Sequence, residues 1–148
     1  MLKHYDSIRR IWKQHGGKTR WLLIERVRCR NDNCRRIHNA LPDFIVPHKH
    51  YSSEVIEDVI DEVVLPDDEF NDSDYPCEMT MARWKYWFER NRDSIDGQLK
   101  SVGYRVLGFS RQLLISGVSL PDELRKDGAG WLGTIIRFIY NSGGFLRP

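Results

Sequence analysis

The sequence predicts an α+β protein, with a small N-terminal β-hairpin followed by a mostly helical region that contains a helix-turn-helix. Basic and apolar side chains alternate, unevenly, through residues 5–30, as they do along a strand. From Ser52 onward the apolar residues recur at helical spacing instead. The 148 residues are about one domain in length. Within it we expect two parts, residues 1–50 and residues 51–148.

Gly16 and Gly17 form a strong turn signal within the alternating stretch. We therefore expect two strands, at about 5–13 and 20–28, joined as a hairpin. A hairpin of this size is marginal alone and normally needs a metal or a packed partner. Pro42 and Pro47 bracket a short segment after it. We interpret this segment as an extended connector, because proline disfavours helix in the residue before it.

The clearest helix in the sequence follows the connector. Ser52 or Ser53 can cap it, Glu54 and Glu57 suit the positive end of its dipole, and it ends at Pro66. A continuous apolar stripe on one face indicates burial. The stripe consists of Val55, Ile56, Val59, Ile60, Val63 and Val64.

The rest of the chain is expected to be helical after one loop. A polar, acidic loop is predicted over Asp67–Pro76, and a second helix over about Glu78–Asn91. These two helices and the turn between them are the predicted helix-turn-helix. Further helical stretches are expected at about 94–117 and 129–141, and Pro121 marks the start of a short turn of helix between them.

The composition is that of an ordinary globular protein. Hydrophobic residues make up 41% of the chain, and no apolar run approaches the roughly 18 residues that a membrane helix requires. The charged N-terminus lacks the apolar segment of a signal peptide. Three cysteines, an odd number, argue against a disulfide scaffold and favour a reducing compartment. We therefore expect a cytoplasmic protein that does not bind membranes.

The net charge of +2 conceals three segments of alternating sign. Residues 1–50 hold twelve Lys and Arg against four Asp and Glu, a net charge of +8. Residues 51–78 hold eleven acids and no base, and residues 79–148 hold eleven bases against six acids. Because local patches decide which partners are attracted, the basic ends predict a polyanionic partner. The acidic middle is a solvated face, an internal neutraliser or a contact for a basic partner.

Cys29 and Cys34 are the sharpest candidates for chemistry. They are separated by four residues, lie in the arginine-rich stretch Arg28–Arg36 and follow the apolar run Trp21–Ile24. A cysteine pair on a hairpin tip is half of a zinc ribbon, with each sulfur about 2.3 Å from the metal. Structural zinc takes four protein ligands. The pair is therefore either part of an incomplete zinc site or two free cysteines at a turn.

Histidines are the remaining candidate zinc ligands. A ribbon takes its other ligand pair from the strand region upstream, so His4 and His15 are the best placed. The alternative for each histidine is a surface hydrogen-bond donor or a phosphate contact. The five are His4, His15, His38, His48 and His50.

Trp84, Trp87 and Phe88 are spaced three and four residues apart on the predicted second helix. Aromatic side chains stack on bases in proteins that bind single strands. The spacing is more typical of a seam that faces the core. We therefore expect these three side chains to be buried.

Nothing in the sequence favours an enzyme. Cys77 has no patterned base beside it, and we interpret it as a structural cysteine. The acids are crowded together rather than placed on separate strands, where they could converge on metal ions. No P-loop, nucleophile elbow or dinucleotide fingerprint is present. We expect no catalysis and no small-molecule substrate.

Several stretches carry a resemblance to a known family: Ile24–Cys29, Cys34–His38, Leu41–Tyr51 and Met79–Phe88. They resemble an uncharacterised bacterial domain family found beside, or fused to, insertion-sequence transposases. The resemblance implies an N-terminal zinc ribbon followed by a helix-turn-helix, and a role in a mobile genetic element. It covers most of the chain and is most specific from residue 21 to residue 51.

The chain departs from this family's pattern in its metal ligands. Typical members place a Cys-x2-Cys pair shortly before the first strand, and no such pair precedes Cys29 here. The resemblance implies the ribbon topology, and it leaves zinc, the implied cofactor, with an incomplete site at Cys29 and Cys34. Members with four cysteines also carry a histidine at the position of His38, which implies a structural role for that residue.

These observations favour a non-catalytic DNA-binding protein associated with a transposable element, which recognises transposon ends or assists a transposase. Basic residues of the hairpin would neutralise phosphates, and those of the second helix would reach the major groove or its backbone. The alternative is a protein-interaction module that docks onto a transposase or a second copy of itself without contacting DNA. The candidate DNA-binding residues are Lys18, Arg20, Arg26, Arg28, Arg30, Arg35, Arg36, Arg83, Lys85, Arg90 and Arg92.

Overall fold

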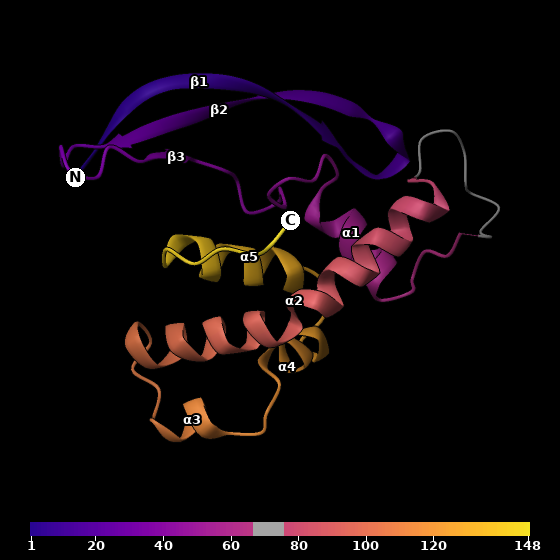
Figure 1. Ribbon diagram of the computed structural model, residues 1–148. Coiled ribbons are helices and arrows are strands. Elements are labelled where there is room, and N and C mark those ends of the chain that lie inside the picture. The colour runs from indigo at the N-terminus through magenta and orange to yellow at the C-terminus, as the bar shows by residue number, and fades with distance from the viewer. Residues whose placement is uncertain (67–75) are drawn as a thin grey trace.

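A computed structural model of the chain describes residues 1–66 and 76–148. An antiparallel sheet of three strands at the N-terminus is followed by a mostly helical region, which confirms the predicted α+β class. The sheet forms an arched layer on one side of the helices, and α5 (Trp131–Asn141) lies below it (Figure 1). The predicted loop Asp67–Pro76 lies outside the described residues except for Pro76.

The sheet is dominated by a long hairpin. Strand β1 (Leu2–Lys13) pairs with β2 (Thr19–Cys29) along its whole length, interrupted by a bulge between His4 and Asp6. Gly16 and Gly17 both have positive φ in the turn, a conformation that glycine adopts without strain. The two predicted strands are therefore confirmed and are longer than expected. Strand β3 (Ile37–Asn39), which was not predicted, pairs with the end of β2.

The connector after the sheet is the packed partner that the hairpin needs. The Arg10 guanidinium reaches it from β1 and donates to the carbonyls of Val46 at 3.0 Å and Lys49 at 2.6 Å. Trp12 packs on Phe44, with ring centroids 4.7 Å apart. Because a lone hairpin is marginal in water, we infer that these contacts hold β1 and β2 in place.

Helix α1 (Ser53–Ile60) begins where the serines predict. Ser52 is its N-cap, and the hydroxyl accepts a hydrogen bond from the backbone N–H of Val55. The helix ends earlier than the predicted Pro66, because Glu62 has a φ of 59°, which lies in the left-handed region. Val63 is consequently exposed rather than part of the apolar stripe.

Helix α2 (Glu78–Arg105) is continuous over 28 residues, so the break predicted between residues 91 and 94 is wrong. Asn91 is buried there and donates to the carbonyl of Trp87 at 2.8 Å, which satisfies its side chain inside the helix. Ile95 and Leu99 continue the buried face beyond it. The apolar stripe therefore runs through the predicted boundary.

The C-terminal elements follow the prediction in part. The helix expected over 94–117 extends only to Arg105, as part of α2, and is followed by the short α3 (Gln112–Ile115). Helix α4 (Leu120–Lys126) begins at the predicted Pro121 signal, and α5 confirms the helix expected near 129–141. The segment between α1 and α2 includes residues outside the described part of the chain, so the helix-turn-helix stays a prediction.

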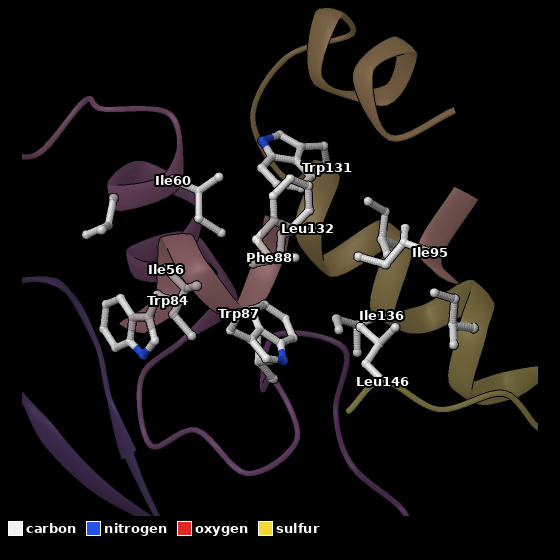
Figure 2. Close-up of a cluster of buried hydrophobic side chains, with 14 of the residues drawn as sticks. Ile56, Ile60, Trp84, Trp87, Phe88, Ile95, Trp131, Leu132, Ile136 and Leu146 are labelled. Carbon is white, nitrogen blue, oxygen red and sulfur yellow. The ribbon is translucent and has the colours of Figure 1, made fainter. Parts of the chain in front are cut away.

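The core lies where α1, α2 and α5 meet (Figure 2). Trp84, Trp87 and Phe88 of α2 are 4%, 5% and 1% exposed, which confirms their predicted burial. Phe88 meets Trp131 edge to face, with ring centroids 5.1 Å apart. Leu132 of α5 is fully buried beside them. Trp84, Trp87 and Phe88 therefore belong to the core and are closed to any ligand.

A buried carboxylate joins α1 to α5. Glu57 is 3% exposed, and its two oxygens accept hydrogen bonds from the backbone N–H groups of Gly130 at 2.5 Å and Leu132 at 2.8 Å. The first turn of a helix leaves such N–H groups without partners, so Glu57 caps α5 from a neighbouring helix. Burial raises the pKa of Glu57 above its ordinary value. Beside it, Asp61 accepts from Trp131 Nε1 at 2.7 Å and from Arg125 at 2.8 Å.

The C-terminal tail lies along α2. The side-chain amide of Asn91 accepts from the N–H of Arg147 at 3.0 Å and donates to its carbonyl at 3.2 Å. Gln98 makes the same pair of bonds with the backbone of Phe145. Leu146, between them, enters the core. No helix in the described ranges is both long and apolar enough to cross a membrane.

Replacing Glu57 with alanine tests the cap of α5. We expect Glu57→Ala to lower the free energy of unfolding by about 1–3 kcal/mol, because two buried N–H groups lose their acceptor. Exposed Glu54 on the same helix is the matched control, and Glu54→Ala should change stability by less than about 0.5 kcal/mol. Chemical denaturation measures both. Equal effects of the two substitutions would show that the buried cap is not a determinant of stability.

Candidate nucleic-acid interface

The open end of the hairpin carries a hollow lined by Lys3, Arg28, Cys29, Arg30, Asp32 and Arg35, which we call the end surface. Lys3 and Arg28 are paired residues of β1 and β2, so the strand register places both at this edge. A compact turn supplies the others. In it the carbonyl of Asn31 accepts from the N–H groups of Cys34 and Arg35, both at 3.0 Å.

The end surface has a strong excess of positive charge. Four of its side chains are cations, and Asp32 is its one acid. Arg35 lies 3.9 Å from Asp32, and both side chains are mostly exposed. An exposed pair at this separation contributes little and is screened by salt. Arg36, next in the turn, is exposed and has no carboxylate partner within residues 1–66 and 76–148.

Tyr5 lies between two arginines beside this surface. The guanidinium carbons of Arg26 and Arg28 are 5.5 Å and 5.7 Å from the centroid of its ring. Arg26 in addition donates from Nε and Nη2 to the two carboxylate oxygens of Asp6, and these hydrogen bonds hold the pKa of Asp6 below its ordinary value. Arg26 is therefore neutralised, whereas Arg28 contacts the ring and keeps its charge available.

The basic residues predicted on α2 divide into two kinds. Lys85 lies 2.9 Å from Glu62, and Arg92 lies 2.5 Å from Asp122, so both are neutralised. Arg83 and Arg90 are exposed and have no carboxylate partner in the described part of the chain. Of these four residues, only Arg83 and Arg90 could contact phosphate without first breaking an ion pair.

The candidate residues do not form one surface. Lys18 and Arg20 lie at the hairpin turn, ten and eight residues before Arg28, so roughly 26–33 Å of β2 separates them from the end surface. Figure 1 shows the start of α2 on the side of the hairpin turn, away from the N-terminus and β3. The structure brings together Arg28, Arg30, Arg35 and Arg36 at the end of the sheet. Lys18 and Arg20 lie apart from them at the hairpin turn, and the cations of α2 form a third, separate group.

Sequence reasoning missed Lys3 as a member of the end surface. Its neighbours Leu2 and His4 give no basic cluster in the sequence. The pairing of Lys3 with Arg28 depends on the bulge between His4 and Asp6, which shifts the register by one residue. If the strand pairing that begins at the hairpin turn continued without this bulge, a different residue of β1 would lie opposite Arg28.

Cys29 and Cys34 supply two of the four ligands that structural zinc requires. The backbone of Arg36 and, to a smaller extent, the side chain of Cys29 lower the pKa of the Cys34 thiol below its ordinary value. No third histidine, cysteine, aspartate or glutamate joins them among the described residues. His15, a predicted ligand, lies 3.1 Å from Asp58 instead. The donor set therefore does not fit a complete zinc site, and zinc binding stays a prediction.

A second hollow lies between the connector and α5. It encloses about 940 Å³, and its lining includes His38, His48, His50 and Arg137. Arg137 lies 3.6 Å from Asp43, and Arg10 is held by backbone carbonyls. This cleft is therefore less basic than the end surface.

The fold and the end surface define an α+β protein whose three-stranded sheet has a cationic end. A family model described as Domain of unknown function (DUF6431) matches residues 1–84. Because the match covers more than half of the chain, the protein belongs to this family. The matched residues include the whole sheet, α1 and the start of α2. No curated protein and no solved structure matches the chain.

A chelator tests whether the cysteine pair supports the fold through zinc. We expect EDTA to leave the midpoint of thermal unfolding unchanged, because two thiolates alone do not make the four-ligand site that contributes folding energy. The Cys29→Ser, Cys34→Ser double variant is the control. Stoichiometric zinc in the purified protein, together with a lower midpoint after chelation in the parent but not in the variant, would contradict this expectation.

Proposed function

We propose that the protein binds DNA without catalysing a reaction on it, and that the end surface contacts the phosphate backbone. One observation carries the proposal: Lys3, Arg28, Arg30 and Arg35 line a single hollow in which Asp32 is the one acid. Cations gathered in this way attract a polyanion and release its condensed counterions on binding.

The chemistry of these side chains supports phosphate as the ligand. Three of the four cations are arginines, and a guanidinium matches two phosphate oxygens with a planar pair of donors. The side chains are carried by the end of the sheet where β3 pairs with β2, and by the turn that joins these two strands. Phosphate contacts position a protein on a duplex but do not select a sequence.

The biological context of the proposal rests on the resemblance described above. In that context the DNA is a transposon end, and the partner is a transposase or a second copy of the chain. Zinc at Cys29 and Cys34 would require ligands beyond the two sulfurs. A protein that recognises a transposon end, or assists a transposase there, needs affinity for DNA and no active site of its own.

A second candidate function is a protein-interaction module, and one observation favours it. The segment around α3 exposes apolar side chains that the core does not cover: Val106, Leu107, Phe109, Leu114, Ile115 and Val118. Ile115 is 83% exposed. A contiguous apolar patch on the surface is a mark of a binding site for another protein.

Charge removal at the end surface tests the proposed function. The double variant Arg30→Gln, Arg36→Gln should weaken binding to duplex DNA and reduce the slope of log affinity against log salt by about 2, since each lost phosphate contact removes about 0.9. Fluorescence anisotropy over a range of salt concentrations measures both quantities.

The matched control removes the same charge from α2. Arg83→Gln, Arg90→Gln should leave the affinity and the salt slope unchanged if the end surface is the binding site. Loss of affinity in the α2 variant alone would show that the DNA binds α2 and not the end surface. If the affinity of the parent protein for duplex DNA does not change with salt concentration, the proposal is contradicted.

Sedimentation velocity without DNA tests the second candidate function. If the apolar segment is an interface between copies, the parent protein should associate as its concentration rises, and Ile115→Lys should abolish the association because it buries an unpaired charge. Exposed Val63→Lys, far from this segment in the sequence, is the control. A parent protein that stays monomeric at all concentrations would exclude self-association through α3.

A further inference from the structure

The third strand of the sheet, β3, is paired on one side only. The strand order is β1-β2-β3, so the far side of β3 is an edge of the sheet. Hydrogen bonds just beyond its two ends fix its register on β2. The N–H of Cys29 donates to the carbonyl of Arg36 at 2.9 Å. The N–H of Ala40 donates to the carbonyl of Glu25 at 2.8 Å.

The backbone groups of Ile37 and Asn39 point out of the sheet. In an antiparallel ladder, residues that are hydrogen-bonded to the neighbouring strand alternate with residues that are not. Arg36 and Ala40 are of the first kind, so Ile37 and Asn39 are of the second. Within residues 1–66 and 76–148, no hydrogen bond uses the N–H or the C=O of either residue. The edge therefore presents donors and acceptors in the order of an extended chain.

This open edge borders the cleft of about 940 Å³ between the connector and α5. The lining of the cleft includes the consecutive residues 37–41. Because side chains alternate between the two faces of a strand, a hollow under one face would be lined by every second residue. A consecutive run indicates that the cleft follows the edge. Figure 1 shows β3 on the side of the sheet toward α5, and α5 contributes Ile136, Arg137 and Tyr140 to the lining.

Apolar side chains make up part of the lining. They come from the edge strand and the residues after it, from the connector and from α5: Ile37, Leu41, Pro47 and Ile136. Ile37 is 43% exposed, although isoleucine in a strand is usually covered by a neighbour. A side chain from an added strand would cover Ile37. The cleft therefore suits an occupant with an apolar side chain as well as a backbone.

The charge in the cleft favours an acidic occupant. Arg10 and Arg137 line it, and Asp43 is the one carboxylate among its described lining residues. Arg137 lies 3.6 Å from Asp43, and both side chains are about half exposed, so this pair contributes little stability. Arg10 is bound to backbone carbonyls and keeps its charge. Three histidines add further possible donors: His38, His48 and His50.

We propose that the cleft between β3 and α5 binds an extended acidic peptide of a partner protein, which pairs with the backbone of Ile37 and Asn39 as a fourth strand of the sheet. In this mode of recognition the main-chain hydrogen bonds supply affinity, and contacts to alternate side chains supply specificity. Side chains on one face of the peptide would contact the apolar residues of the cleft. A carboxylate beside them would reach Arg137.

The open edge commits the site to a polypeptide. An unpaired edge is a template for the backbone of another chain. The sugar-phosphate backbone of DNA offers acceptors without donors, so it could not satisfy the carbonyls of Ile37 and Asn39. A second copy that added its own β3 would bring Arg35 and Arg36 beside the strand, and residues 35–41 contain no acid. Such a pairing would add positive charge to a cleft that already has an excess of it, which opposes binding.

This inference goes beyond the proposed function, because it names a second ligand class and a second surface. The end surface acts through arginine side chains, whereas the cleft acts through the backbone of β3. A proline at position 39 changes only the second of these. The two proposals can therefore fail independently.

The test uses the full chain and a fluorescein-labelled peptide of eight residues in which valine and glutamate alternate. We expect fluorescence anisotropy to show binding, and the same peptide with lysine in place of glutamate to bind more weakly. Asn39→Pro should weaken binding by roughly 2- to 12-fold or more, because it removes one outward N–H. Proline is tolerated at this place because the N–H faces away from β2. Asn39→Ala, which keeps the N–H, is the matched control and should bind like the parent.

Amide hydrogen exchange gives a second readout that needs no variant. The N–H groups of Ile37 and Asn39 should exchange rapidly in the free protein and slowly in the complex, because the added strand protects them. Chemical denaturation of Asn39→Pro checks that its fold is retained. The affinity of this variant for duplex DNA should equal that of the parent.

Four results would overturn the inference. In the first, Asn39→Pro binds the peptide as tightly as Asn39→Ala. In the second, the exchange of Ile37 and Asn39 does not slow when peptide is bound. In the third, Arg30→Gln, Arg36→Gln loses peptide binding while Asn39→Pro keeps it, which would place the peptide on the end surface. In the fourth, the parent is a dimer that Asn39→Pro converts to a monomer. If peptide binding fails in any of these ways while duplex binding still depends on Arg30 and Arg36, the proposed function stands.

Discussion

Four acids in or directly after α1 bind partners within the molecule, and they leave the arginines of the end surface unpaired: Glu57, Asp58, Asp61 and Glu62. Glu57 binds the first turn of α5, and Asp61 binds Arg125 and Trp131. Glu62 pairs with Lys85, and Asp58 lies beside His15 at the hairpin turn. These four acids therefore neutralise groups within the molecule, whereas Glu54 on the same helix is exposed. None of the four pairs with an arginine of the end surface.

The hairpin is long, and the contacts described for its inner face tie it to the connector rather than to the helical core. Arg10, Trp12 and the bridge between Lys13 and Tyr51 make these contacts, all toward the turn end of β1. The end surface lies at the other end, beyond the bulge at residues 4–6. The arginine-rich end of the sheet is therefore at the opposite end from the contacts that tie the hairpin to the connector.

Much of the fold could be predicted from local signals, and the errors occurred where tertiary packing decides. Gly16-Gly17 and Ser52 specify a turn and a cap through their own backbone chemistry, so both predictions are confirmed. The continuity of α2 depends on a buried Asn91 whose partners are Trp87 and the distant C-terminal tail. No local pattern carries that information. The early end of α1 before Glu62 likewise has no local signal in the sequence.

The candidate site shows the same division between local and tertiary information. The cluster Arg28, Arg30, Arg35 and Arg36 is contiguous in the sequence, and the structure keeps it together at one end of the hairpin. The ion pairs that neutralise Arg26, Lys85 and Arg92 join residues that are 20 or more positions apart. Predicting them requires the strand register and the helix packing. Lys3 was missed for the same reason, because its place opposite Arg28 depends on the bulged register.

The most direct measurement of the central claim is a titration of isotope-labelled protein with a short DNA duplex, followed by the backbone amide signals in NMR spectra. The account predicts that the amides of residues 28–36, and of Lys3 beside them, shift first and most, while those of residues 83–92 on α2 stay in place. Shifts confined to α2, or an absence of shifts at the arginine-rich turn at saturating duplex, would contradict it.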